Sequence, residues 1–327
     1  MSSSFTVTRR TAMAGSAVLV AGQFAFAGGV VPAGAAAQQR GIATPTVNRV
    51  KLGAFEITTV SDGSVVAPGP HPTFGANVGA EQVKELVEQN FLPADQMRNG
   101  YTPVVVNTGR EVIVFDTGNG AERRPEAGNF AQALVGSGIS PGDVDIVVIT
   151  HFHGDHIGGL MENGEPVFPN ARYVMGETEF DFWTSPDRAS GSTANGAALV
   201  QKNVVPLKEK TTFVKGGDSV VSGITAIEAF GHTPGHMAFN IESNGQRLVL
   251  AADTANHYVA SLQRPDWHVR FDMDKEAAAA TRRKIFDMIA ADRVPFTGYH
   301  MPFPAIGYVE KMDQGYRYVP ATYQLTL

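Results

Sequence analysis

The sequence has no cysteine among its 327 residues. Disulfide bonds, thiolate nucleophiles and thiolate-ligated metal sites are therefore excluded, which leaves histidine and carboxylate side chains as metal ligands. The chain also lacks a basic block, because its net charge of −6 is spread along its length. Nucleic-acid-binding proteins present clustered lysine and arginine, so we expect no nucleic-acid partner. A hydrophobic share of 43% and a charged share of 18% predict an ordinary globular protein.

Residues 38–327 contain no apolar run long enough to span a bilayer. The first forty residues differ: Arg9 and Arg10 precede a stretch rich in alanine, glycine and valine that carries no charge until Arg40. Small residues then form an Ala-x-Ala site at positions 35–37. This pattern predicts a cleaved export signal of the twin-arginine type over residues 1–37. We expect residues 38–327 to form one domain, periplasmic or secreted, with no stable membrane insertion after processing.

Hydrophobic patterning predicts a strand-rich chain with interspersed helices. Strands are expected over residues 49–60, 103–116, 144–149, 171–175, 211–214, 224–228, 238–242, 248–252 and 295–297. Helices are expected over residues 81–91, from residue 130 to 134, and over residues 275–291. Strands covered by helices are typical of layered α/β or α+β packing.

Three of the nine histidines fall within six residues, His151-Phe152-His153-Gly154-Asp155-His156, directly after a predicted buried strand. Residues two apart in an extended segment face the same side, so His151 and His153 can bind one ion together. Asp155 and His156 follow at the turn and can reach a second ion. Imidazole and carboxylate groups suit zinc. An isolated histidine is usually structural, but this spacing is not easily explained that way.

Three further polar residues each follow an apolar strand: His232, Asp253 and His300. Strand ends are where a layered scaffold presents polar groups to a shared cleft. We therefore expect these three side chains to join the cluster around residues 151–156. His236 is interpreted as a structural partner of the site, since metal-binding histidines need such support.

This ordered series, preceded by Phe115-Asp116-Thr117-Gly118, resembles the motifs of the metallo-β-lactamase superfamily. The resemblance covers about residues 51–312 and implies an α+β fold, a four-layer αββα sandwich with metals at one edge between its two sheets. It also implies two divalent ions, zinc first, with manganese, iron or cobalt also compatible. By resemblance, the first metal is held by His151, His153 and His232, the second by Asp155, His156 and His300, and Asp253 bridges the two.

Within the superfamily, the sequence is similar to methyl parathion hydrolase and the related lactonases and aryl esterases. The similarity rests on residues 167–171, 181–183, 231–236 and 315–320. It implies a substrate-pocket position for Trp183, with core packing as the alternative, and a possible homodimer. His257, four residues after Asp253, is a second pocket candidate. The loop over residues 120–126 is charged, unlike the apolar loop expected of that hydrolase, which argues against organophosphates as the main substrate.

These features predict a metal-dependent hydrolase in which a hydroxide bridging two metal ions cleaves a lactone, aryl ester or phosphotriester bond of a small ester-like substrate. Asp155 and Asp253 are the predicted catalytic carboxylates, because they can accept hydrogen bonds from the hydroxide and carry a proton to the leaving group. Two alternatives stay open: a glyoxalase II-like thioesterase, and a non-catalytic metal-binding protein on the same fold.

Overall fold

The computed structural model describes residue 39 and residues 42–327. The predicted signal segment, residues 1–37, lies outside the described residues, so its role and its cleavage stay predictions. The fold below is that of the compact unit formed by residues 44–327. Among the helices of the described residues, none is both long and apolar enough to cross a membrane.

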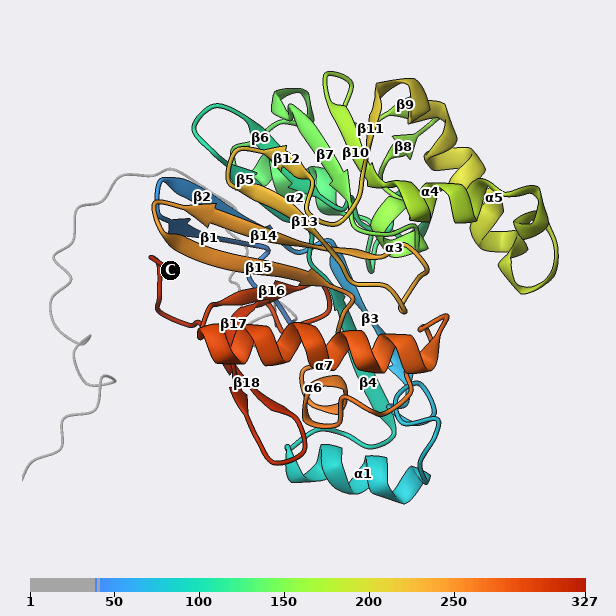
Figure 1. Cartoon of the computed structure of the whole chain (residues 1–327), viewed down its shortest axis with the longest axis vertical. Helices are drawn as coiled ribbons and strands as arrows, with labels where there is room; N and C mark the ends of the chain where they lie inside the picture. Colours follow the sequence, from blue (N-terminus) through green and yellow to red (C-terminus); the bar gives the residue numbers. More distant parts are fainter. Residues whose placement is uncertain (1–38, 40–41) are drawn as a thin grey trace, which may run out of the picture. The chain divides into compact units, whose positions relative to one another are not determined.

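Two seven-stranded mixed sheets form the centre of this unit (Figure 1). The first sheet has the order β1 (Val47–Leu52), β2 (Phe55–Val60), β5 (Val104–Asn107), β6 (Val112–Phe115), β7 (Ile146–Ile149), β10 (Arg172–Gly176) and β11 (Thr211–Val214). The second has the order β12 (Ser219–Val221), β13 (Ile224–Glu228), β14 (Met237–Ser243), β15 (Gln246–Ala252), β16 (Phe296–Gly298), β17 (Ile306–Lys311) and β18 (Tyr316–Pro320). Two small hairpins complete the strands: β3 (Gly63–Pro68) with β4 (Gln96–Tyr101), and β8 (Met161–Glu162) with β9 (Glu165–Pro166).

Helices cover the outer faces of both sheets (Figure 1). The α-helices are α1 (Ala80–Gln89), α2 (Phe130–Gly136), α3 (Gly154–Ile157), α4 (Glu177–Thr184), α5 (Ala194–Asn203), α6 (Ala260–Gln263) and α7 (Lys275–Asp292). Short 3-10 turns lie at Ala121–Arg123, Pro141–Asp143, Pro186–Ala189, Gly191–Thr193 and Val205–Lys210.

Three apolar layers hold the elements together. Between the sheets, side chains such as Ile57 and Leu250 are buried, and the rings of Phe115 and Phe239 meet edge to face at 5.2 Å between centroids. A second layer joins the first sheet to α2, α4 and α5, and a third packs α7 against the second sheet. Because each sheet is apolar on both faces, both faces must be covered. The chain therefore has the predicted αββα sandwich.

The structure differs from the expected elements at the first strand region. Residues 47–60 form two strands, β1 and β2, around a turn at Gly53. Gly53 has a φ of +59°, and a Cβ there would lie 2.1 Å from the backbone oxygen of Ser243. A side chain is thus excluded at this turn by conformation and by space. Helices α4 and α5 and the β17–β18 hairpin lie outside the elements expected from patterning.

Candidate metal centre

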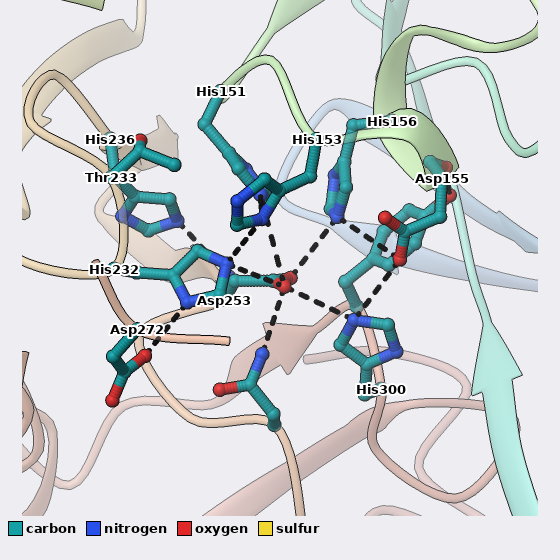
Figure 2. Close-up of polar contacts among 12 residues, drawn as sticks. His151, His153, Asp155, His156, His232, Thr233, His236, Asp253, Asp272 and His300 are labelled. Carbon is teal, nitrogen blue, oxygen red and sulfur yellow. Dashed lines mark hydrogen bonds and ion pairs between the residues drawn. The ribbon is translucent and has the colours of Figure 1, made fainter. Parts of the chain in front are cut away.

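Loops at one edge of the two sheets carry the predicted ligands (Figure 2). The loop after β7 supplies His151 and His153, and the short helix α3 supplies Asp155 and His156. Strands β15 and β16 are parallel neighbours, so their carboxyl ends bring Asp253 and His300 to the same edge. His232 lies on the loop between β13 and β14. The structure brings all seven predicted ligand residues together.

The seven side chains form overlapping groups around Asp253. The groups are His151–His153–His232, His151–His156–Asp253 and Asp155–His156–His300, and within each group the ligand atoms lie within 4.8 Å of one another. In the first group, His153 Nδ1 lies 3.1 Å from His151 Nε2 and 2.9 Å from His232 Nε2. The first and third groups share no residue, and Asp253 lies between them, so the arrangement suits two metal ions.

Asp253 lies between the groups and is almost fully buried. Its Oδ2 lies 3.1 Å from His300 Nε2 and 3.3 Å from His232 Nε2, while its Oδ1 lies 3.3 Å from His156 Nε2. Asp155 is more open and lies 3.5 Å from His300 Nε2. The two carboxylates therefore differ in access to solvent, although both line the same cleft.

The outer ring nitrogens of the ligand histidines contact hydrogen-bond acceptors. His232 Nδ1 donates to Asp272 Oδ1 at 2.8 Å, and His156 Nδ1 donates to Asp116 Oδ2 at 2.8 Å. His300 Nδ1 donates to the backbone oxygen of Gly100 at 2.9 Å. A proton on the outer nitrogen leaves the inner nitrogen with a free lone pair, which is the form that binds a metal.

Asp116, in the first motif of the resemblance, orients a second ligand through Thr150. The Thr150 hydroxyl donates to Asp116 Oδ2 at 2.9 Å, and the Thr150 hydroxyl oxygen itself lies 3.1 Å from His151 Nδ1. Since that hydroxyl proton is used, the threonine oxygen accepts from His151 Nδ1, and His151 Nε2 is left as a lone pair. Asp116 therefore fixes the tautomers of His151 and His156 together.

The inner atoms of the cluster fit a bound cation. His156 Nε2 and Asp253 Oδ1 are buried acceptors with no hydrogen-bond partner. His153 Nδ1 faces ring nitrogens of both His151 and His232, and a single proton satisfies only one such contact. Buried unsatisfied acceptors cost free energy. Divalent ions at the cluster would satisfy these atoms at once.

The charge balance also favours positive charge at the centre. Burial lowers the pKa of His151 and of His153 well below the usual range. At His232, hydrogen bonds with Asp253 and Asp272 outweigh burial and raise the pKa to about 9. At Asp253, His300 and His156 outweigh burial and hold the carboxyl pKa well below its usual range. The carboxylates thus attract a cation, whether a proton or a metal.

His236 supports Asp253 rather than joining the ligands. Its Nδ1 donates to the backbone oxygen of Ala229 at 3.0 Å, and its Nε2 accepts the backbone N–H of Asp253 at 3.1 Å. Burial lowers the pKa of His236 to about 3, which keeps the ring neutral and able to accept. This contact fixes where the Asp253 backbone enters the site.

Sequence reasoning missed Glu179, a fully buried carboxylate on α4. Its Oε1 accepts the backbone N–H of Phe152 at 2.9 Å and the indole N–H of Trp183 at 2.8 Å. Its Oε2 accepts the Thr233 hydroxyl at 2.8 Å and the Gly235 N–H at 2.9 Å. One carboxylate therefore joins the loop that carries His151 and His153 to the loop that carries His232. Asp272, the partner of His232, was also missed, because no motif surrounds it.

The structure places Trp183 in the core, which was the alternative to its expected pocket position. Trp183 is 5% exposed and belongs to the core between the first sheet and its helices. A Cβ on Gly196 would lie 2.5 Å from the indole ring, so the missing side chain at Gly196 makes room for it. The α4 segment turns the ring inward toward Glu179. Among described residues, those that line the two main cavities do not include Trp183.

A cleft of about 810 Å³ opens onto the centre and is lined by His153, Asp155, His232, Asp253 and His300. Its walls include Tyr101, Leu199, Phe271 and the charged loop residues Glu122 and Arg123. His257 lines a neighbouring cavity of about 530 Å³ that shares Tyr101 and His300 with the cleft. The pocket role expected for His257 stays a prediction, since the residue lies next to the cleft and not in it.

The site has the composition of a binuclear metallohydrolase centre on an αββα scaffold. The family model for the metallo-beta-lactamase superfamily matches residues 99–297, and the chain belongs to this family. It is 30% identical over 128 residues to N-acyl homoserine lactonase AttM of Agrobacterium fabrum, covering 36% of this chain and 44% of that protein. The chain thus spans less than half the length of this curated relative.

Two solved structures are similar over most of their length. The hydrolase AbOPH of the beta-lactamase superfamily aligns with a TM-score of 0.79 and 25% identity, over 86% of this chain and 99% of that one. AidC, a dizinc quorum-quenching lactonase in complex with its product, aligns with a TM-score of 0.78 and 24% identity, over 85% of this chain and 98% of that one. The second likeness is evidence for the fold alone.

Proposed function

We propose that this protein is a metal-dependent hydrolase that cleaves a lactone or a related ester bond. The observation that carries the proposal is the convergence of ligand atoms from five histidines and two carboxylates, with buried inner atoms that have no hydrogen-bond partner in the described residues. We assign the first metal to His151, His153 and His232, and the second to Asp155, His156 and His300, with Asp253 between them. Zinc is the first candidate.

Two divalent ions, when bound, would activate a water near neutral pH and polarise the scissile carbonyl. The protein's own residues would orient the attacking water and transfer its proton. Asp155 is partly exposed in the cleft, so its carboxylate can take a proton from the attacking water and deliver it to the leaving oxygen. Asp253 is buried and accepts the Asn256 amide N–H at 2.9 Å, which limits it to orienting the water and the ligands.

The shape of the cleft supports a small ester-like substrate. Its volume of about 810 Å³ is within the range of small-molecule sites, and its walls combine aromatic side chains with charged ones at the 121–123 loop. The curated relative is named as an N-acyl homoserine lactonase, which makes a lactone our first substrate class. Aryl esters and phosphotriesters, by the similarity to methyl parathion hydrolase, are further candidates for the same centre.

The proposal is tested by hydrolysis assays on purified protein with metal content determined in the same sample. The panel is an acyl-homoserine lactone, dihydrocoumarin, a nitrophenyl ester, a thioester, methyl parathion and a β-lactam. Turnover of a lactone or ester that depends on metal, is lost in His151→Ala and is kept in His268→Ala supports it. The control His268 pairs with Glu276 at the surface, away from the cluster. Two bound metals without turnover would favour a metal-binding protein, and preferred thioester cleavage would favour a thioesterase.

We also propose that the mature protein is exported by the twin-arginine route. The proposal rests on Arg9-Arg10 and on the Ala-x-Ala site at 35–37. N-terminal sequencing of exported protein should begin at Gln38, and Arg9→Lys with Arg10→Lys should leave uncleaved protein inside the cell. Unchanged export of the double variant would contradict it. A homodimer, implied by the family likeness, is tested by the mass of the purified protein in solution.

A further inference from the structure

Arg282 is the largest fully buried side chain of the described residues. It lies on the face of α7 that also carries Ile285, Phe286 and Ile289 into the core. Burying a charge costs several kcal/mol unless it is paired and hydrogen-bonded. A charged residue at this position therefore calls for an explanation beyond packing.

The guanidinium of Arg282 contacts two segments that lead to the metal centre. Its Nε donates to the backbone oxygen of Thr254 at 2.9 Å, and its Nη2 donates to Asp272 Oδ2 at 2.8 Å. Its Nη1 donates to the backbone oxygen of Pro265 at 2.7 Å. The side chain thus fastens the start, the middle and the end of the segment between residues 253 and 272.

Each end of that segment is connected to a predicted metal ligand, one by the chain itself and one by a hydrogen bond. Thr254 directly follows Asp253, and Asp272 Oδ1 accepts the Nδ1 proton of His232 at 2.8 Å. Asp272 is itself buried, and its two carboxylate oxygens face His232 and Arg282, one each. An Asp272 without its arginine would be a buried, half-paired carboxylate, free to turn away from His232.

We infer that Arg282 is a positioning residue for both metal sites, acting on His232 through Asp272 and on Asp253 through the Thr254 carbonyl. The inference rests on the ligand assignment of the proposed function. Only a fixed fork of donors can hold a carboxylate and separate carbonyls in one plane, so lysine cannot replace arginine here. Outer partners of metal ligands typically contribute 10–100-fold in metal affinity.

The chain offers a matched control one residue away. Arg283 is half-exposed and pairs with Asp266, which lies in the same 253–272 segment. Asp266 stands between Pro265 and Trp267, whose backbone oxygens both accept from Arg282 Nη1. Both arginines therefore extend from α7 to the same loop, Arg282 on its buried side and Arg283 on its solvent side. Arg283→Met removes a charge and a loop contact without touching Asp272 or Thr254.

The experiment is a competitive zinc titration of metal-free protein against a chelator, with cobalt spectra of the same variants. We expect Arg282→Met and Arg282→Lys to weaken both zinc equivalents by 10-fold or more and to change the cobalt spectrum. Asp272→Asn should weaken mainly one equivalent, and Arg283→Met should stay within twofold of wild type. Circular dichroism and thermal melts of the metal-free variants establish that they are folded.

The inference is overturned if a folded Arg282 variant binds two zinc ions with wild-type affinities. If Arg282→Met does not fold, the zinc affinities of Arg282→Lys decide the question. If neither variant folds, wild-type zinc affinity in Asp272→Asn overturns the inference. Failure of the ligand assignment looks different, because wild-type protein would then bind less than one zinc. A lactone assay is not needed for either distinction.

Discussion

At the scale of single residues, buried carboxylates without motifs hold the predicted ligands in place. Glu179 accepts four hydrogen bonds, and three of its partners, Phe152, Thr233 and Gly235, lie 27 to 56 residues away in the sequence. Burial raises the pKa of its carboxyl, while the hydrogen bonds from Phe152, Thr233, Gly235 and Trp183 oppose that rise. Because all four partners are donors, the site suits an ionised carboxylate and not an amide.

Glu179→Gln should therefore destabilise the protein. The amide N–H₂ of glutamine would face two donors that it cannot accept from, and each buried unsatisfied group costs about 1–3 kcal/mol. We expect the free energy of unfolding in urea to fall by about 2 kcal/mol or more. Glu177→Gln, at a half-exposed position on the same helix where Glu177 pairs with Lys215 at the surface, should change it by less than about 0.5 kcal/mol. Equal effects of the two substitutions would contradict the role of Glu179.

Trp183→Phe separates a core role from a pocket role. The indole donates to Glu179 and fills the space beside Gly196, so its loss leaves a small cavity and one unpaired acceptor position. We expect the free energy of unfolding to fall by about 1–2 kcal/mol, with KM for the best substrate of the panel within twofold of wild type. A KM raised severalfold with unchanged stability would restore Trp183 to the pocket.

The ligand residues could be predicted from the sequence because they are close in the chain or directly follow strands. His151 to His156 form one run, and strand ends meet at a common edge whatever the details of packing. Glu179, Asp272 and Arg282 could not be predicted. Each acts through hydrogen bonds with distant segments. The helical periodicity of α7 assigns Arg282 to the buried face, but it does not indicate which groups would pair with a charge there. The pocket role of Trp183 is inferred from family similarity, whereas its helical spacing favours the core position in which the structure places it.

At the scale of elements, His257 stabilises the start of α6. Its Nδ1 accepts the backbone N–H groups of Val259 and Ala260, both at 3.1 Å. Protonation would remove this lone pair, and burial accordingly lowers the pKa of His257 to about 4 from an ordinary value of 6.5. Between these two values the unfolded chain binds more protons than the folded one, so stability rises with pH across this window.

We expect His257 to make metal-free protein less stable at pH 5 than at pH 7, by about 2 kcal/mol. His257→Asn keeps a side-chain acceptor that caps helices well but does not titrate. The difference in unfolding free energy between pH 7 and pH 5, measured in urea with a chelator present, should therefore shrink by that amount in the variant. The other histidines contribute equally to both proteins. A pH dependence unchanged by the substitution would show that His257 titrates normally in the folded state.

At the scale of the whole molecule, the metal centre joins the two halves of the sandwich. Ligands from the first-sheet side, His151 to His156, meet ligands from the second-sheet side, His232, Asp253 and His300. Bound ions would thus crosslink the two sheets at one edge. Since only the folded chain assembles this set, metal binding should be coupled to global stability and not to one loop.

Zinc in 100-fold excess over each dissociation constant adds about 2.7 kcal/mol per site, so two sites should raise Tm by about 10 °C or more. The gain should shrink on acidification, because zinc must displace protons from histidines such as His232, whose pKa is about 9. Each displaced proton removes about 1.4 kcal/mol of the gain per pH unit. Calorimetry with zinc and with chelator, from pH 8 down to pH 6, measures both effects, and His151→Ala should lose most of the gain. If Tm is the same with zinc and with chelator at every pH, the seven residues join the sheets without metal, through the hydrogen bonds already described.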